Sequence, residues 1–134
     1  MGAIVIDASV ILAALDPLDA FHGATVAAVR RVRESEDDFV LPASVLAQVL
    51  VGVARQGEDL LQTRAEAVSA AFGPVVELDA SIAVEAARLR ARHASLRLPD
   101  ALVLATAEAC GAKVILTGDR RWVGLDGRVE LIRN

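Results

Sequence analysis

One stretch of the chain constrains its fold more than any other: residues 96–119, which read LRLPDALVLATAEACGAKVILTGD. Pro99 suits the first turn of a helix, and Asp100 follows it. Residues 101–107 offer no outward polar face, so we expect a helix that is buried on most sides. Gly111 then suits the residue that ends such a helix.

The second half of this stretch predicts a strand. Residues 113–117 are short, mostly apolar and rich in β-branched side chains, and Gly118 follows them. This pattern favours a strand inside a covered parallel sheet. Asp119 lies just past the carboxyl end of that strand, which is the end where ligands bind in open α/β sheets.

The rest of the chain alternates in the same way between short apolar strands and helices. Strands are expected at residues 3–6, 39–41, 75–78 and 129–132, the last at an edge, and helices at residues 8–15, 21–33, 45–54, 58–72 and from about residue 80. Such alternation implies an α/β fold with three layers, right-handed crossovers and a central, mainly parallel sheet of four to five strands. Residues 1–134 suit a single domain.

Composition excludes several classes of protein. The net charge of −4 argues against a general basic field that coats nucleic acid. The four aromatic residues, with no Tyr among them, cannot build the base-stacking platforms of typical single-strand binders, so an RNA ligand would be handled by its backbone. A single cysteine, Cys110, excludes a Cys-based metal site. No apolar run is long enough to span a bilayer and no signal-peptide pattern is present, so we expect a cytoplasmic protein without membrane contact.

Three aspartates stand where chemistry is expected. Asp7 and Asp119 each follow an apolar strand, and the two carboxylates converge if the first and fourth strands are neighbours in the sheet. Asp100, in the first turn of its helix, would lie on the same rim. The structural alternatives are a helix cap or turn for Asp7 and Asp119, and an interaction with the helix dipole for Asp100.

Gathered carboxylates need a proton or a cation. At an effective dielectric constant near 20, a pair of carboxylates 4 Å apart costs up to about 4 kcal/mol. An all-oxygen cluster selects a hard ion, so Mg²⁺ or Mn²⁺ is expected. Such an ion activates water and stabilises the departing oxygen, which is the chemistry of phosphodiester hydrolysis. The alternative is a solvated set of unrelated acids.

Four motifs in order resemble a known family: IVIDASV, LPASVLAQVLVG, LPDALVLATA and LTGDRRW, spread over nearly the whole chain. Together they are similar to a PIN-domain ribonuclease, specifically a VapC-type toxin of a toxin–antitoxin pair. The resemblance implies a Rossmann-like PIN fold and a Mg²⁺- or Mn²⁺-dependent endoribonuclease. It also implies a homodimer and a small antitoxin protein that covers the active site.

The resemblance assigns roles to individual residues. The acidic catalytic and metal-binding positions are Asp7, Asp100 and Asp119, while Thr117 and Ser9 match hydroxyl positions that help to hold the site. Where the family pattern has a glutamate, this chain has Gln48. An amide brings no charge and cannot act as a base, so metal affinity should fall.

Gln48 therefore leaves a second function open. We hypothesise that Gln48 faces the acidic cleft and marks a weakened site; the structural alternative is a buried amide satisfied by backbone groups. The alternative function is a catalytically weakened PIN module that binds RNA or an antitoxin without efficient cleavage. An aspartyl-phosphate phosphatase is disfavoured, because the sequence Asp7-Ala8-Ser9 lacks a second acid two residues after the first.

Local basic residues would supply the RNA contact that the global charge does not. Candidates that guide RNA phosphates are Arg88, Arg90, Arg92, Arg97, Arg120 and Arg121. The alternative is an ordinary solvated helix face. Trp122 is interpreted as a packing residue rather than as a base platform.

Overall fold

The computed structural model describes residues 1–133 and contains one sheet of five strands, all parallel, in the order β3-β2-β1-β4-β5. The prediction of a mainly parallel α/β sheet is thus confirmed. The strands are β1 (Ala3–Ile6), β2 (Asp38–Pro42), β3 (Val75–Val76), β4 (Val114–Thr117) and β5 (Val129–Leu131). β1 lies beside β4, and Ile6 pairs with Leu116 at the carboxyl end of this pair.

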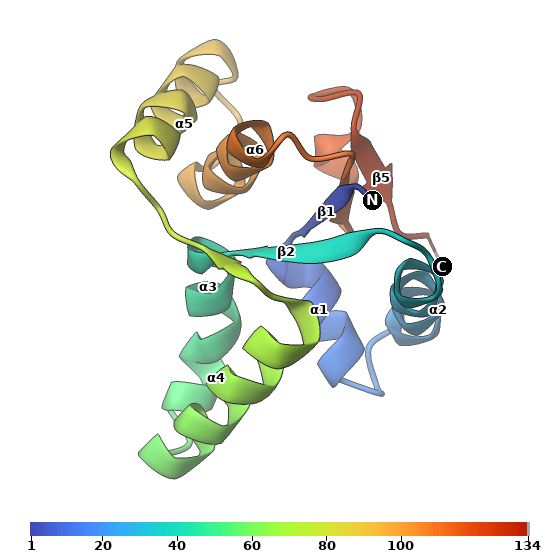
Figure 1. Cartoon of the computed structure of the whole chain (residues 1–134). Coiled ribbons are helices and arrows are strands. Elements are labelled where there is room, and N and C mark those ends of the chain that lie inside the picture. Colours follow the sequence, from blue (N-terminus) through green and yellow to red (C-terminus); the bar gives the residue numbers. More distant parts are fainter. Residues whose placement is uncertain (134) are drawn as a thin grey trace.

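Helices cover both faces of the sheet. They are α1 (Ala8–Leu15), α2 (His22–Glu34), α3 (Ala43–Ala54), α4 (Glu58–Phe72), α5 (Ala80–Arg92), α6 (Leu98–Cys110) and the short 3₁₀ helix η1 (Arg120–Trp122). Figure 1 shows α5 and α6 together on one side of the sheet and α1 to α4 on the other. This arrangement gives the three layers expected from the sequence.

The α6 helix is the buried helix that the sequence predicts. Its side chains at Asp100, Ala101 and residues 103–107 are buried, and a proline occupies its first turn. The helix ends at Gly111, whose φ of 61° lies in the left-handed region that favours glycine. The buried run fixes this helix against the sheet, so Asp100 has little freedom to move.

The third strand is shorter than residues 75–78, and here the prediction was wrong. Only Val75 and Val76 pair with β2, at the edge of the sheet. Leu78 is 48% exposed and therefore gains little from extending the strand. The backbone turns instead into α5, where Asp79 accepts a hydrogen bond from the Ile82 N–H at 2.9 Å.

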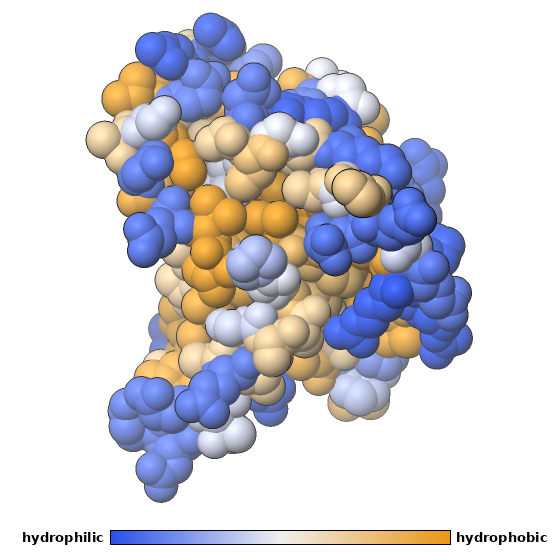
Figure 2. Space-filling model, in the orientation of Figure 1, coloured by the Kyte–Doolittle hydropathy of each residue, from blue (hydrophilic) through white to orange (hydrophobic). Residues whose placement is uncertain are grey.

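Exposed apolar side chains gather on part of the surface. Figure 2 shows a hydrophobic area in the middle of this face, with hydrophilic residues above and below it. Exposed apolar side chains of α3, β3, α5 and the segment between the last two are Val51, Val75, Leu78 and Val84. No helix within residues 1–133 has the length and apolar character needed to cross a membrane.

Candidate metal centre

Asp7 lies at the carboxyl end of β1 and is 7% exposed. Its Oδ1 accepts a hydrogen bond from the Ala8 N–H at 2.7 Å, so Asp7 also caps α1. Its Oδ2 accepts from Ser9 Oγ at 2.8 Å and from Thr117 Oγ1 at 2.9 Å. The functional and structural interpretations of Asp7 are therefore compatible: capping orients the carboxylate without neutralising it.

Two hydroxyl groups hold Asp7 and the β4 end together. Thr117 is fully buried, and its Oγ1 also accepts a hydrogen bond from the Asp119 N–H at 3.1 Å. Ser9 Oγ in turn accepts from the Gly118 N–H at 3.0 Å. Each hydroxyl thus donates to Asp7 and accepts from the backbone that follows β4, which joins the two strand ends into one rigid unit.

The electrostatics of Asp7 are unfavourable for a second negative charge. Burial raises the pKa of the Asp7 carboxyl above its usual value, while the hydrogen bonds from Ser9 and Thr117 oppose this rise. The Asp100 carboxylate raises the pKa of Asp7 further, so these two acids lie close enough to repel. They come from the ends of β1 and α6, as expected for a shared cleft.

Asp100 is also 7% exposed, and one cation of the chain reaches it. Arg97 Nε lies 3.3 Å from Asp100 Oδ2, and the Arg97 side chain itself is largely exposed. An exposed guanidinium in such a position is displaceable, because exposed ion pairs contribute little free energy.

Asp119 is held by a stronger contact. Arg121 Nε lies 3.0 Å from Oδ1 and Arg121 Nη2 lies 2.6 Å from Oδ2, which is a bidentate pair. The Arg121 N–H also donates to Oδ1 at 2.9 Å, so Asp119 forms the turn that starts η1. Hydrogen bonding from Arg121 lowers the pKa of Asp119, which keeps this carboxylate ionised.

The donor chemistry fits a hard divalent cation, although the carboxylates are not all free to bind one. Asp7 and Asp100 offer buried carboxylate oxygens whose mutual repulsion a cation would relieve, and arginine already contacts Asp100 and Asp119. Among residues 1–133, however, no three His, Cys, Asp or Glu side chains form a group that could hold a metal ion as they stand. The metal set of three aspartates therefore stays a prediction, and it requires Asp119 to leave Arg121.

Gln48 does not adopt the buried role considered as its structural alternative. Its side chain is exposed on α3, and no hydrogen bond to it occurs within residues 1–133. The neighbours of Gln48 in sequence are apolar, but α3 packs through Val45 and Val49 and leaves the Gln48 side in solvent. That Gln48 faces the acidic cleft stays a hypothesis.

The candidate RNA-guiding arginines are used in different ways. Arg88 pairs with Glu85 at 3.0 Å, and Arg90 donates to the Leu96 carbonyl, so both are occupied within the α5 region. Arg97 and Arg121 contact the acids as described. Arg92 and Arg120 are exposed and take part in no salt bridge within residues 1–133.

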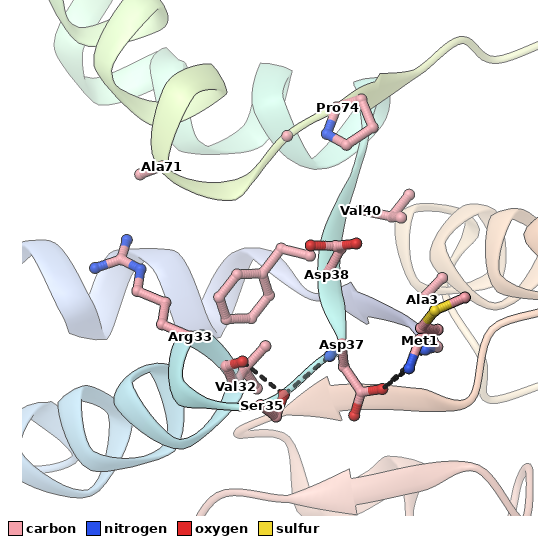
Figure 3. Close-up of a pocket in the computed structure, with 13 residues that line it drawn as sticks. Met1, Ala3, Val32, Arg33, Ser35, Asp37, Asp38, Val40, Ala71 and Pro74 are labelled. Atoms are coloured by element: carbon pink, nitrogen blue, oxygen red, sulfur yellow. Dashed lines mark hydrogen bonds and ion pairs between the residues drawn. The ribbon is translucent and has the colours of Figure 1, made fainter.

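A pocket lies at the amino-terminal ends of β1 and β2, away from these acids. It has a volume of about 570 Å³ and is lined by the start of β1, the start of β2 and the segment before β3. Figure 3 shows Asp37 directed at the Met1 amino group, and this carboxylate also pairs with Lys113 at 2.9 Å. The acids of the metal centre lie at the opposite, carboxyl ends, so this pocket is separate from that centre.

Trp122 is confirmed as a packing residue, since it is only 1% exposed. Its Nε1–H has no hydrogen-bond acceptor within the described chain. The residue anchors η1 in the core while Arg120 and Arg121 remain outside. Burial of Trp122 thus fixes the turn that carries Asp119.

Comparison with solved structures identifies the same fold in several proteins. FitAcB from Neisseria gonorrhoeae matches with a TM-score of 0.72 and 22% identity, over 94% of this chain and 95% of that one. A toxin–antitoxin complex from Klebsiella pneumoniae matches with a TM-score of 0.74 and 19% identity, over 98% of both chains. Mycobacterium tuberculosis VapC20, described as a toxin that cleaves the sarcin–ricin loop, matches with a TM-score of 0.68 and 22% identity, over 90% of this chain and 95% of that one.

At these identities the likeness shows the fold. A search among curated proteins found none that matches the sequence. The family model of the PIN domain, however, matches residues 4–127, which contain Asp7, Asp100 and Asp119. The chain therefore belongs to the PIN-domain family.

Proposed function

We propose that this PIN-domain protein is a Mg²⁺- or Mn²⁺-dependent endoribonuclease and the toxin of a toxin–antitoxin pair. The observation that carries the proposal is the buried Asp7 carboxylate at the carboxyl end of β1, oriented by three donors and repelled by Asp100. No cation of the described chain pairs with Asp7. A buried carboxylate without a counter-charge is costly for stability, and a metal-binding role explains its position.

The residues of the candidate metal centre have two different roles in this proposal. Asp7, Asp100 and Asp119 would hold the ion, and Thr117 and Ser9 keep Asp7 in one orientation. When bound, the ion lowers the pKa of a water molecule and neutralises charge on a phosphate. The protein uses water as the nucleophile, and no covalent intermediate is expected. The toxin assignment is supported by the fold shared with VapC20 and with the Klebsiella complex.

The direct test is RNA cleavage by metal-stripped protein, with Mg²⁺ or Mn²⁺ added back. Cleavage should return with metal and disappear in Asp100→Asn, whose amide is nearly isosteric but uncharged. Arg55→Gln, at the exposed tip between α3 and α4, is a control for handling and purity. Activity that survives Asp100→Asn would assign cleavage to a contaminant or to another site and would contradict the proposal.

The second candidate function is a PIN module that binds without efficient cleavage. Two observations favour it: residue 48 is an uncharged amide, and the described acids do not form a ready-made group of three. Restoring the charge with Gln48→Glu should then raise both Mn²⁺ affinity and RNA cleavage. If neither changes, residue 48 lies outside the metal centre and does not explain a weakened site.

Exposed apolar side chains support two further parts of the proposal, a partner protein and a homodimer. The exposed apolar side chains Val51, Val75, Leu78 and Val84 are consistent with burial against another chain. A small antitoxin that covers the active site would also need to reach the rim that carries Arg97 and Arg121. Size-exclusion chromatography with light scattering measures the dimer directly; a monomer at micromolar concentration would contradict that part of the proposal.

A further inference from the structure

A further concave site includes Gly118 and Arg120, the two residues that flank Asp119 in the chain. It has a volume of about 530 Å³ and lies at the carboxyl ends of β4 and β5. Its lining residues are Phe21, Gly118, Arg120, Val123, Leu131, Ile132 and Arg133. We call it the β5 pocket. Its volume falls within the roughly 300–1,000 Å³ of small-ligand sites, so it suits one nucleotide rather than a duplex.

Backbone contacts connect the β5 pocket to the metal centre. Gly118 lies between Thr117 and Asp119 in the chain, and its N–H donates to Ser9 Oγ at 3.0 Å. On the other side, the Ile132 N–H donates to the Thr117 carbonyl at 2.8 Å. The wall of the pocket and the support of Asp7 are therefore parts of the same short segment. A ligand in the pocket would therefore contact the segment that carries Asp119.

The charge of the β5 pocket is opposite to that of the protein as a whole. It contains Arg120 and Arg133, and no Asp or Glu lines it. Both arginines are exposed, and neither takes part in a salt bridge within residues 1–133. In a chain with a net charge of −4, two such guanidinium groups in one hollow favour an anion with several oxygens.

The rest of the lining is apolar and includes one aromatic ring. Val123, directly after η1, is 57% exposed. Phe21 is partly exposed, and its backbone is fixed because the Phe21 N–H donates to Asp19 Oδ1 at 2.8 Å. An aromatic face beside cationic groups is the combination that binds the base and the phosphates of single-stranded nucleic acid.

We propose that the β5 pocket seats one nucleotide of single-stranded RNA adjacent to the scissile phosphodiester. Its base lies against Phe21 and Val123, and the flanking phosphates contact Arg120 and Arg133. This inference rests on the proposed ribonuclease function. It adds a residue that sequence reasoning did not select, Arg133, and it adds a local base contact to a chain that has too few aromatic residues for a longer platform.

Binding can be measured separately from cleavage. Metal-stripped wild-type protein in EDTA is titrated into a fluorescein-labelled single-stranded RNA, and the fluorescence anisotropy is recorded. We expect Arg120→Gln combined with Arg133→Gln to weaken binding about tenfold or more. The slope of the logarithm of the association constant against the logarithm of the salt concentration is negative, and its magnitude should decrease by about 0.7 for each lost phosphate contact. Arg55→Gln removes one positive charge, against two in the double variant, at the distant tip of α3 and α4 (Figure 1) and should leave binding unchanged.

The base contact has its own test. Phe21→Leu keeps an apolar side chain but removes the aromatic face, so it should weaken binding of normal RNA severalfold. It should have little effect on an RNA of the same length with abasic nucleotides. Thermal unfolding followed by circular dichroism verifies that each variant is folded. Equal losses for the normal and the abasic RNA would overturn the assignment of Phe21 to a base.

The outcomes distinguish this inference from the proposed function. If wild-type protein cleaves RNA with metal but the double arginine variant binds and cleaves like Arg55→Gln, the β5 pocket is not an RNA site. If wild-type protein fails to cleave with either metal while the double variant loses RNA binding, the pocket stands and the nuclease proposal falls. In an active enzyme, loss of the pocket should raise KM more than it lowers kcat, because ground-state contacts are removed.

Discussion

Replacement of Thr117 by valine should destabilise the protein without changing the shape of its core. Thr117 is fully buried, and valine has nearly the same shape, so no large cavity arises. The change removes the donor to Asp7 Oδ2 at 2.9 Å and the acceptor of the Asp119 N–H at 3.1 Å. A hydrogen bond to a charged group contributes about 1.5–3 kcal/mol and a neutral one about 0.5–1.5 kcal/mol. We therefore expect the free energy of unfolding to fall by about 2–4 kcal/mol at pH 7.

The destabilisation caused by Thr117→Val should increase as pH rises. Burial raises the pKa of Asp7 above its ordinary value of 3.8, so between that value and the folded pKa the folded protein binds more protons than the unfolded chain. The contribution of Asp7 to stability therefore falls as pH rises through this window. Loss of the Thr117 donor raises the Asp7 pKa further, so the deficit of Thr117→Val should be larger at pH 7 than at pH 4.5.

Urea denaturation of wild type, Thr117→Val and Thr117→Ser at pH 4.5 and pH 7 provides the test. Thr117→Ser keeps the hydroxyl and loses one buried methyl group, so it should cost about 1 kcal/mol at both pH values. The role assigned to this hydroxyl would be refuted if Thr117→Val lost the same free energy of unfolding at the two pH values, or lost less than about 0.5 kcal/mol at pH 7.

Other substitutions test the helix ends and the acid pair. Gly111→Ala should reduce the free energy of unfolding by about 1–2 kcal/mol, because alanine is strained at a φ of 61°. Gly52→Ala, inside α3 with open space around the new methyl group, should raise it by about 0.5–1 kcal/mol; urea denaturation measures both. Arg121→Ala should raise Mn²⁺ affinity by about 1.4- to 5-fold, since an exposed ion pair with Asp119 contributes roughly 0.2–1 kcal/mol that the metal no longer has to displace. Isothermal titration calorimetry measures this affinity, and an unchanged value would show that Arg121 does not compete with the metal.

Much of the fold was predictable because it depends on local patterns. The apolar strand before Asp7, the buried run of α6 and the glycine at residue 111 each determine their own structure with little help from distant residues. The adjacency of β1 and β4 followed from the usual topology of such sheets and is confirmed. The length of β3 was not predictable in this way, because an edge strand ends where its pairing partner ends.

The positions of some candidate site residues were predictable, but their contacts were not. Ser9 and Thr117 were expected near the acids, and both donate to Asp7. The pairing of Asp119 with Arg121 was missed, although the two-residue spacing at the start of a turn is a usable signal for such a contact. Arg133, which lines the β5 pocket, was not a sequence candidate, because only the pairing of β5 with β4 brings it beside residues that are distant in sequence.

The different settings of the three aspartates also bear on how this fold changes over evolution. Asp7 and Asp100 are built into buried elements, so any substitution around them is tested against the stability of the whole domain. Asp119 belongs to a turn that Trp122 anchors in the core, whereas its other neighbours Arg120 and Val123 are exposed and have little packing to lose. Substitution of these two exposed residues therefore costs little stability, and it changes the lining of the β5 pocket. Such a division allows one hydrolytic scaffold to acquire new target preferences while its reaction stays the same.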